Sequence, residues 1–208
     1  METFMMVDEE HCAARRRFFE DHAEGWEDRN YSPEKLRRLE SLLARVDLDR
    51  GMTVLDAGCG QGVLLPFLRR RIGGEGRLIA LDASAAMLRY AAQRHPGAWL
   101  LHAGVEAIPL LDGYVDAVVC FSAFPHFSDK EAAAREFYRL LRPGGAAYVL
   151  HIDGRERLND LHDRHHAVCG DHLPCPHGMK KIFSRAGFSK MRADESAEHY
   201  YFAACKQE

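Results

Sequence analysis

Three glycines lie at alternate positions directly behind a short apolar run, at Gly58, Gly60 and Gly62. The run over residues 53–55 is β-branched and aliphatic like a buried strand, and the residues from Val63 onward are typical of a helix start. Glycines at such a strand-to-helix turn can adopt positive φ and let a ligand approach the backbone. The helix N-terminus behind them offers free N–H groups. The pattern therefore predicts a ligand-binding turn.

An acid, Asp82, ends the next apolar run, RLIALD, where it could bind the hydroxyls of a ribose. Two ligands that contain a ribose compete for such a turn in an α/β sheet, a dinucleotide and S-adenosylmethionine. The dinucleotide fingerprint requires a third glycine three residues after the second, for close packing of the helix on the strand. Val63 stands there, three residues after Gly60, so the pattern disfavours a nicotinamide-dependent oxidoreductase.

Histidines and cysteines gather in residues 151–180, which contain half of the 12 histidines of the chain. Asn159, His162, His165 and His166 follow one another at helical spacing, so a helix there would present one imidazole-rich face. This segment would lie at the carboxyl edge of a parallel sheet, where ligands bind in such folds.

Three interpretations of this segment remain open. Its imidazole and thiolate groups could hold a metal ion such as zinc. The candidate ligands are His162, His166, Cys169, His172, Cys175 and His177. One or two of the histidines, together with His126 and His151, could instead act as bases or substrate contacts. The segment could also be a solvated helix and loop with incidental histidines.

Strands and helices alternate along the chain, which predicts a parallel sheet with helices on both faces. The strands are expected at 53–56, 77–82, 98–103, 116–122 and 145–152, followed by two that could pair antiparallel, at 188–196 and 198–206. The helices are expected at 11–24, 33–46, 62–72, 84–94, 129–141 and 180–187. Ser32 and Ser84 are favourable N-caps, and Pro66 requires a place in the first turn of its helix.

The composition indicates one globular domain over residues 1–208 with no transmembrane helix. The net charge of -3 argues against a broad nucleic-acid surface. The N-terminus lacks the basic and apolar regions of a secretory signal, so we expect a cytoplasmic protein. Six cysteines without regular spacing make a disulfide framework unexpected.

Five motifs in order resemble the class I S-adenosylmethionine-dependent methyltransferases, in particular the small-molecule, methyltransferase type 11-like group. They are FFEDHAEGWED, VLDAGCGQG, IALDAS, GVEAIPLLDGYVDAVVCFSAFPHF and EFYRLLRPGGAAYVLH. The resemblance implies a Rossmann-like, doubly wound α/β fold of three layers, with a mostly parallel seven-stranded sheet and an antiparallel last strand. It also divides the chain into four parts: an N-terminal helical cap (1–50), a cofactor-binding core (51–150), a His-rich substrate-side insertion (151–180) and a final helix with a strand pair (181–208).

The resemblance implies a role for each matching residue. The methionine moiety of the cofactor would lie against Asp56, Gly58, Cys59, Gly60 and Gly62. Asp82 would take the ribose hydroxyls, and the remaining contacts would come from Ala83, Met87, Val105, Glu106, Phe121 and Ser122. Gly104 replaces the aspartate that commonly contacts adenine, so backbone groups are expected to hold the ring. Met87 could instead be core, and Trp26 could be either core or part of a lid over the cleft.

The implied activity is methyl transfer to a small molecule that the sequence does not name. Such a displacement mainly requires alignment, and it needs a base only if the nucleophile carries a proton that must leave. His126 and His151 are the candidate catalytic residues. The turn FSAFPHF lacks the Asp/Asn-Pro-Pro-aromatic pattern of amino-methylating nucleic-acid enzymes, so no nucleic acid is expected. The alternatives are a non-catalytic cofactor-binding or metal-binding protein on the same fold, and the disfavoured oxidoreductase.

Overall fold

The computed structural model describes residues 2–208, with side-chain surroundings from Cys12 onward. Over these residues a seven-stranded sheet runs in the order β3-β2-β1-β4-β5-β7-β6. The strands are β1 (Thr53–Ala57), β2 (Arg77–Asp82), β3 (Trp99–His102), β4 (Val115–Phe121), β5 (Leu141–His151), β6 (Ser189–Glu195) and β7 (Tyr200–Cys205). Only β7 pairs antiparallel with its neighbours β5 and β6, which confirms the expected sheet.

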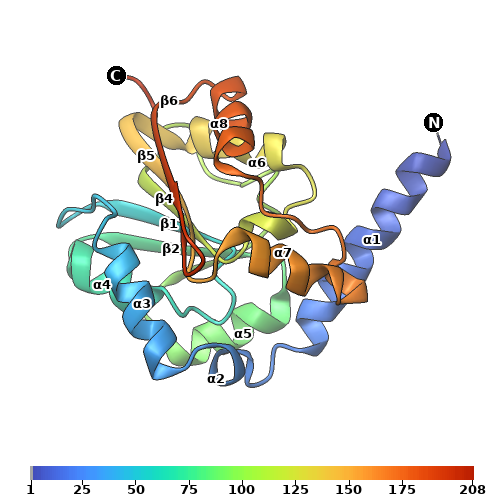
Figure 1. The fold of residues 1–208 in the computed structure, drawn as a ribbon. Helices are drawn as coiled ribbons and strands as arrows, with labels where there is room; N and C mark the ends of the chain where they lie inside the picture. Colours follow the sequence, from blue (N-terminus) through green and yellow to red (C-terminus); the bar gives the residue numbers. More distant parts are fainter. Residues whose placement is uncertain (1) are drawn as a thin grey trace.

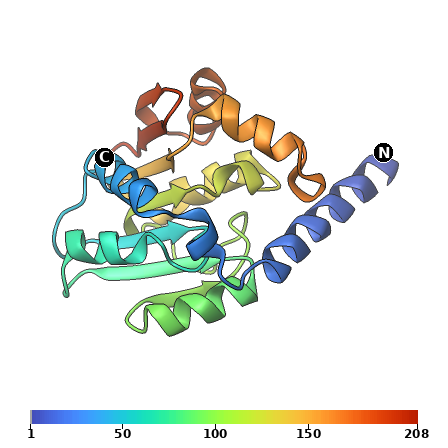
Figure 2. The ribbon, with the colours of Figure 1, turned by 60° about the horizontal axis from the view of Figure 1, so that its bottom comes forward.

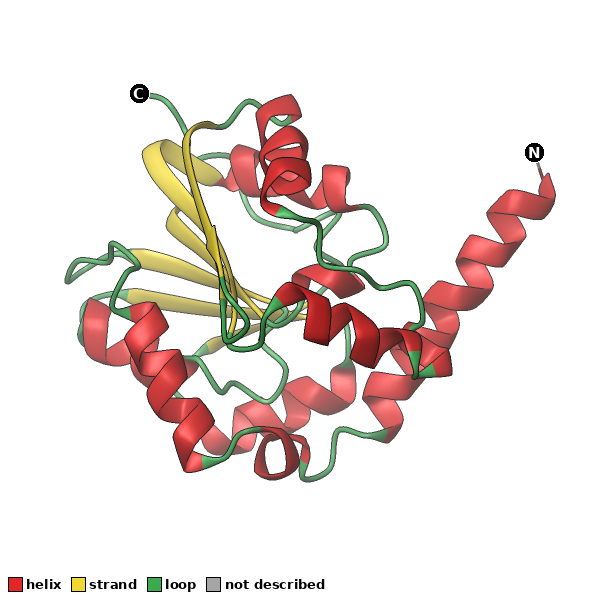
Figure 3. Ribbon diagram, viewed as in Figure 1, coloured by secondary structure: helices red, strands yellow, loops and turns green. Residues whose placement is uncertain are grey.

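Helices cover both faces of the sheet and form three layers (Figures 1 and 3). They are α1 (Glu2–Asp21), α2 (Trp26–Asn30), α3 (Pro33–Leu43), α4 (Leu65–Ile72), α5 (Ala85–Arg94), α6 (Lys130–Leu140), α7 (Arg155–Asp163) and α8 (Pro176–Arg185). Two short 3-10 helices, η1 (Phe124–His126) and η2 (His166–Val168), follow β4 and α7. None of the helices in the described part of the chain is long and apolar enough to cross a membrane.

The sheet separates two apolar clusters. Val54 and Leu55 are neighbours in β1 but belong to different clusters, because successive side chains of a strand point to opposite faces. Leu39 of α3 and Leu68 of α4 pack in the cluster with Val54, and Phe137 of α6 packs in the cluster with Leu55. Both faces of the central strands are therefore buried, as in other parallel sheets.

Local signals place some helix ends correctly, whereas α1 begins at Glu2 and not at residue 11, and α8 begins at Pro176 and not at residue 180. The Ser32 hydroxyl accepts a hydrogen bond from the Lys35 N–H, and the Ser84 hydroxyl accepts one from the Met87 N–H, so both are the N-caps that we predicted. Pro66 lies in the first turn of its helix. That helix begins at Leu65 and not at residue 62, because turns continue through the glycine segment.

The helices α1, α2 and α7 lie at the carboxyl ends of the parallel strands. Figures 1 and 2 show the N-terminal part of α1 projecting from the body, while its other end packs near α5 and η2. Helix α7 lies over the same edge of the sheet (Figure 1). These three helices enclose a space above β1, β2 and β4.

Candidate active site

A cavity of about 630 Å³ opens at the carboxyl ends of β1, β2 and β4. Its wall includes Asp56 at the end of β1, Asp82 at the end of β2 and Phe121 at the end of β4. The strand order reverses its direction between β1 and β4, which is where open α/β sheets bind ligands. Helices α1, α2 and α7 supply further parts of the wall.

The glycine turn after β1 forms the floor of this cavity. Gly58, Gly60 and Gly62 have φ of 79°, 54° and 99°, as the sequence pattern predicted. A Cβ at Gly58 would lie 2.4 Å from the Ala123 Cβ, whereas a Cβ at Gly60 would meet nothing within 4 Å. Gly58 therefore allows close packing of the protein on itself, and Gly60 leaves its backbone open to a ligand.

Gly62 is the glycine of this turn that does not line the cavity. A Cβ there would lie 2.5 Å from the His95 ring, at the end of α5. The role of Gly62 in this structure is thus to let the turn pack against α5.

Asp82 holds the glycine turn in place. Its Oδ2 accepts a hydrogen bond from the Gly60 N–H at 2.8 Å, and its Oδ1 accepts one from the Ser84 N–H at 2.8 Å. Burial raises the pKa of this carboxyl, and the two hydrogen bonds oppose that shift. The carboxylate lines the cavity beside the backbone that it orders.

Asp56 is a buried acid whose oxygens find no partner within the described residues. Its side chain lines the cavity, and the residue is 1% exposed. Burial raises its pKa well above the usual value, and the nearby Asp82 and Glu27 carboxyls raise it further. A buried, unpaired carboxylate is costly, so this position suits a ligand that brings a positive charge.

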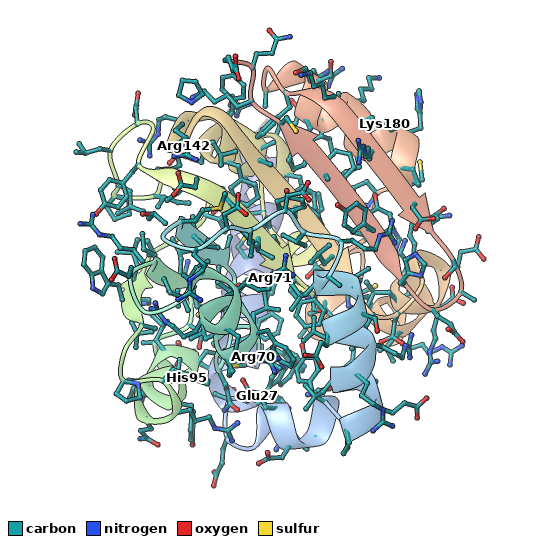
Figure 4. The ribbon with its side chains drawn as sticks, turned by 90° about the vertical axis from the view of Figure 1, so that its left-hand side faces the viewer. Glu27, Arg70, Arg71, His95, Arg142 and Lys180 are labelled. Carbon is teal, nitrogen blue, oxygen red and sulfur yellow. The ribbon has the colours of Figure 1, made fainter. Side chains whose placement is uncertain are left out.

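Glu27, on α2, adds a third acid to the cavity wall, after Asp56 and Asp82. Its Oε2 lies 2.6 Å from the Arg94 Nη1, while its Oε1 is buried without a partner among the described residues. The Glu27 N–H donates to Gln61 Oε1 at 3.2 Å, so α2 docks directly on the glycine turn. Figure 4 shows Glu27 in the same lower region as His95 at the end of α5.

Our sequence reasoning missed Glu27 and Gln61. The sequence offered one indication that Glu27 is a site residue, which is its place directly after Trp26 in the first of the five motifs.

The other predicted cofactor contacts also line the cavity: Cys59, Ala83, Met87, Val105, Glu106, Phe121 and Ser122. Met87 is 3% exposed and packs in a small apolar cluster with Ala23, so it belongs to both the wall and the core. Glu106 Oε1 accepts the Ser128 N–H at 3.0 Å and thereby fixes the approach to α6. Ser122 has φ of 53°, an unusual conformation for a residue other than glycine at the end of a strand.

The two predicted catalytic histidines occupy different places. His126 lines the cavity, and its Nδ1 lies 2.8 Å from Asp171 Oδ2. His151 is 2% exposed and is not part of the cavity wall; its ring packs 6.4 Å from that of Tyr200. Burial, with the nearby His126 and His162, lowers the pKa of His151 to about 3.

The His-rich segment converges only in part on the cavity. His162 of α7 is buried at the wall, where its Nδ1 lies 2.6 Å from the Asp171 carbonyl oxygen, and His165 also lines the cavity. The expected imidazole-rich helix face is not formed, because α7 ends at Asp163 before His165 and His166.

The predicted metal site is not supported by the geometry. His166, Cys169, His172, Cys175 and His177 are exposed, and the His172 Nε2 lies 2.7 Å from Asp163 Oδ1. No group of three His, Cys, Asp or Glu side chains within the described residues is arranged to hold a metal ion. Helix α7 turns His162 inward, whereas the residues beyond it lie on the exposed surface.

Comparison with known proteins agrees with this site. Residues 54–145 match the family of methyltransferase domains. The fold, the cavity and this match define the class of protein, an α/β domain of the methyltransferase type with a cavity at the edge of its sheet. This match and the curated relatives support the class I S-adenosylmethionine-dependent methyltransferase family for this chain.

Two curated relatives and one solved structure illustrate the similarity. The chain is 40% identical over 119 residues to a malonyl-[acyl-carrier protein] O-methyltransferase of Pectobacterium atrosepticum, covering 55% of this chain and 45% of the relative. It is 36% identical over 131 residues to a trans-aconitate 2-methyltransferase of Azoarcus sp., covering 60% and 49%. A SAM-dependent methyltransferase structure from Thermotoga maritima superposes with a TM-score of 0.75 at 19% identity, covering 93% of this chain and 100% of that one. The chain spans about half the length of these curated relatives.

Proposed function

We propose that this chain transfers a methyl group from S-adenosylmethionine to a small-molecule acceptor. The observation that carries this proposal is Asp56, a buried and unpaired carboxylate beside a backbone that Gly60 leaves open. The methionine end of the methyl donor carries an ammonium group, which would neutralise Asp56 with help from Glu27. The charge of the donor and the charge of the cavity wall therefore match.

The remaining contacts follow from the places of the residues around the cavity. Asp82 would bind the ribose hydroxyls while it keeps its two backbone hydrogen bonds. Ala83, Met87 and Val105 would contact the adenosine, with Glu106 held by its bond to the Ser128 N–H at the edge of the loop. Gly58 and Cys59 would support the methionine moiety, and Phe121 and Ser122 would face the methyl group.

When bound, the donor supplies a methyl group activated on a sulfonium. The chain then needs to align the acceptor and, for a protonated nucleophile, to remove its proton. His126 is the better placed of the two predicted catalytic histidines because it lines the cavity, whereas His151 lies behind the wall. A direct role for His151 stays a prediction from sequence, as do the functional division of the chain into four parts and a cytoplasmic location.

The relatives suggest the range of acceptors. Their names state O-methylation of malonyl-[acyl-carrier protein] and 2-methylation of trans-aconitate, so members of the family act on unrelated carbon skeletons. We propose a small molecule for this chain and no nucleic acid, and we do not propose a metal.

The proposal is tested by incubating the protein with labelled S-adenosylmethionine and a panel of small acids, phenols, amines and thiols. Release of S-adenosylhomocysteine that depends on one acceptor class, and that Gly60→Ala abolishes, would support it. Tight binding of S-adenosylhomocysteine with no turnover on any class would favour the non-catalytic alternative.

A further inference from the structure

Ionisable side chains from three distant parts of the chain meet beside the cavity, and two of them, Arg15 and His126, line it. Asp171 comes from the His-rich segment, Arg15 from α1 and His126 from η1. The Asp171 carboxylate lies 2.8 Å from His126 Nδ1 and 3.2 Å from Arg15 Nη1, and Arg15 also donates to the His126 carbonyl oxygen. Asp171 is 4% exposed and Arg15 is 7% exposed, so the charges are paired out of water.

This arrangement selects one form of the His126 imidazole. An ionised carboxylate can only accept a hydrogen bond, so the Nδ1 of His126 carries the proton and Nε2 is the basic nitrogen. The ring is also held by packing, with centroids 5.0 Å from Phe19 and 4.8 Å from His162. His126 is therefore a fixed imidazole in the wall of the cavity, and its Nδ1 is already hydrogen-bonded to Asp171.

The surroundings of His126 favour its neutral form. Burial lowers its pKa, and the charges of His162 and Arg15 lower it further, while Asp171 acts in the opposite direction. Lys130, a further cation close to Asp171, directs its ammonium to the Pro125 and Phe127 carbonyl oxygens. A neutral imidazole is the form that accepts a proton.

His126 belongs to a segment that packs directly on the glycine turn. The segment after β4 packs on Gly58, because a Cβ there would lie 2.4 Å from Ala123 and 3.8 Å from the Phe127 ring. His126 lies between these two contacts and lines the same cavity. A ligand bound against the glycine turn thus shares its space with the imidazole.

Aromatic and aliphatic side chains form one side of the cavity. Phe19 and Trp26 have ring centroids 5.6 Å apart, and the Phe18 ring centroid lies 5.8 Å from that of His165 in an edge-to-face contact. Leu158 and Leu161 of α7 complete this apolar side. Such walls suit a flat, mostly apolar molecule. Arg15 is already paired with Asp171 and is not available to an acceptor carboxylate.

We infer that His126, positioned by Asp171, removes the proton from a hydroxyl group on a planar, mostly apolar acceptor of the phenol or enol class. This inference rests on the proposed methyl transfer. The proton passes from the hydroxyl oxygen to Nε2 of His126. The oxygen electron pair forms the bond to the methyl carbon, while the carbon–sulfur bond breaks and its electrons remain on sulfur as S-adenosylhomocysteine. His126 is the catalytic residue, and Asp171 is a positioning residue.

The test uses 4-nitrophenol, which is yellow only as the phenolate. It is titrated into the complex of the full chain with S-adenosylhomocysteine, across a pH series. In the wild-type complex, bound 4-nitrophenol is expected to ionise at lower pH than the free compound, because His126 takes the proton. His126→Gln should remove the shift and Asp171→Asn should reduce it, whereas the control His177→Gln, at an exposed site, should leave it unchanged.

Two further measurements complete the test. Nitrogen NMR of wild-type imidazoles should find His126 protonated at Nδ1 and not at Nε2, a result that does not depend on any variant folding. With phenols that are methylated, His126→Gln should lower kcat about 10²–10⁴-fold. The inference is overturned if 4-nitrophenol does not bind, binds without a shift, or shifts equally in His126→Gln. Failure of S-adenosylhomocysteine to bind would instead overturn the proposed function.

Discussion

The Asp82 carboxylate accepts the Gly60 N–H at 2.8 Å and so links the end of β2 to the turn that follows β1. Its other oxygen accepts the Ser84 N–H at 2.8 Å. Both oxygens therefore organise backbone at the place where the ribose and methionine moieties of the methyl donor would meet. Asp82 orders the turn and also lines the cavity.

Replacing Asp82 tests this link. We expect Asp82→Asn to weaken binding of S-adenosylhomocysteine by roughly 1–3 kcal/mol, because hydrogen bonds to a charged acceptor are lost. Calorimetry measures the change, and Asp49→Asn, at an exposed site, is the control. Equal affinities of the Asp82 variant and the wild type would remove Asp82 from the binding site.

Gly60 lies on the floor of the cavity, and Gly51, which does not line it, is a matched control for its substitution. Both have positive φ, 54° and 86°, and a Cβ at either would meet nothing within 4 Å. Alanine at each should cost about 1–2 kcal/mol of stability through the backbone alone. Only Gly60→Ala should lose S-adenosylhomocysteine binding, by at least tenfold. Similar affinities of the two variants would contradict close approach of a ligand to Gly60.

Asp56 is expected to lower the stability of the free protein and to strengthen binding of the ligand. Its raised pKa means that the folded state of the free protein holds a proton more tightly than the unfolded chain, so stability falls as pH rises above the usual carboxyl pKa. Asp56→Asn should remove this loss and raise the Tm of the free protein, more at pH 8 than at pH 5. The same variant should bind S-adenosylhomocysteine at least tenfold more weakly, since a charged partner of the ammonium is lost. A variant less stable than the wild type at pH 8 would contradict an unpaired charge.

His151 should make the fold sensitive to acid. Its pKa of about 3 in the folded state lies below the usual imidazole value, so the unfolded chain binds the proton first and stability falls as pH drops from about 6.5 towards 3. Between pH 7 and pH 5 this amounts to about 2 kcal/mol. His126 and His162, which face His151, contribute in the same direction.

Urea unfolding at pH 5 and pH 7 measures this dependence. The His151→Gln variant should lose part of the difference that the wild type shows, while the exposed His177→Gln should keep it. An unchanged pH dependence in His151→Gln would show that His151 does not titrate as its burial implies.

Local sequence signals predicted the parts of the site that neighbouring residues determine. The positive φ of the glycines, the caps at Ser32 and Ser84, and Asp82 at a strand end all depend on a few adjacent residues. The fold followed from the alternation of strands and helices, because the hydrophobic pattern extends over the whole core.

Contacts between distant segments were not predictable in the same way. The bond from His126 to Asp171 joins residues 45 positions apart, and Arg15 reaches them from α1. The pairing of Glu27 with Arg94 likewise depends on how α2 docks on α5. The described residues do not support the metal hypothesis, for a related reason. Helical spacing alone did not show that α7 ends at Asp163, and the residues beyond it therefore do not continue its face.

The central claim is that the cavity above Gly60 binds S-adenosylmethionine and not a dinucleotide. Isothermal calorimetry of the full chain with S-adenosylhomocysteine and, separately, with NADH tests it most directly. We predict one S-adenosylhomocysteine bound per chain, no heat from NADH, and loss of the signal in Gly60→Ala. Binding of NADH in the same cavity, or no binding of S-adenosylhomocysteine by the wild type, would contradict the claim.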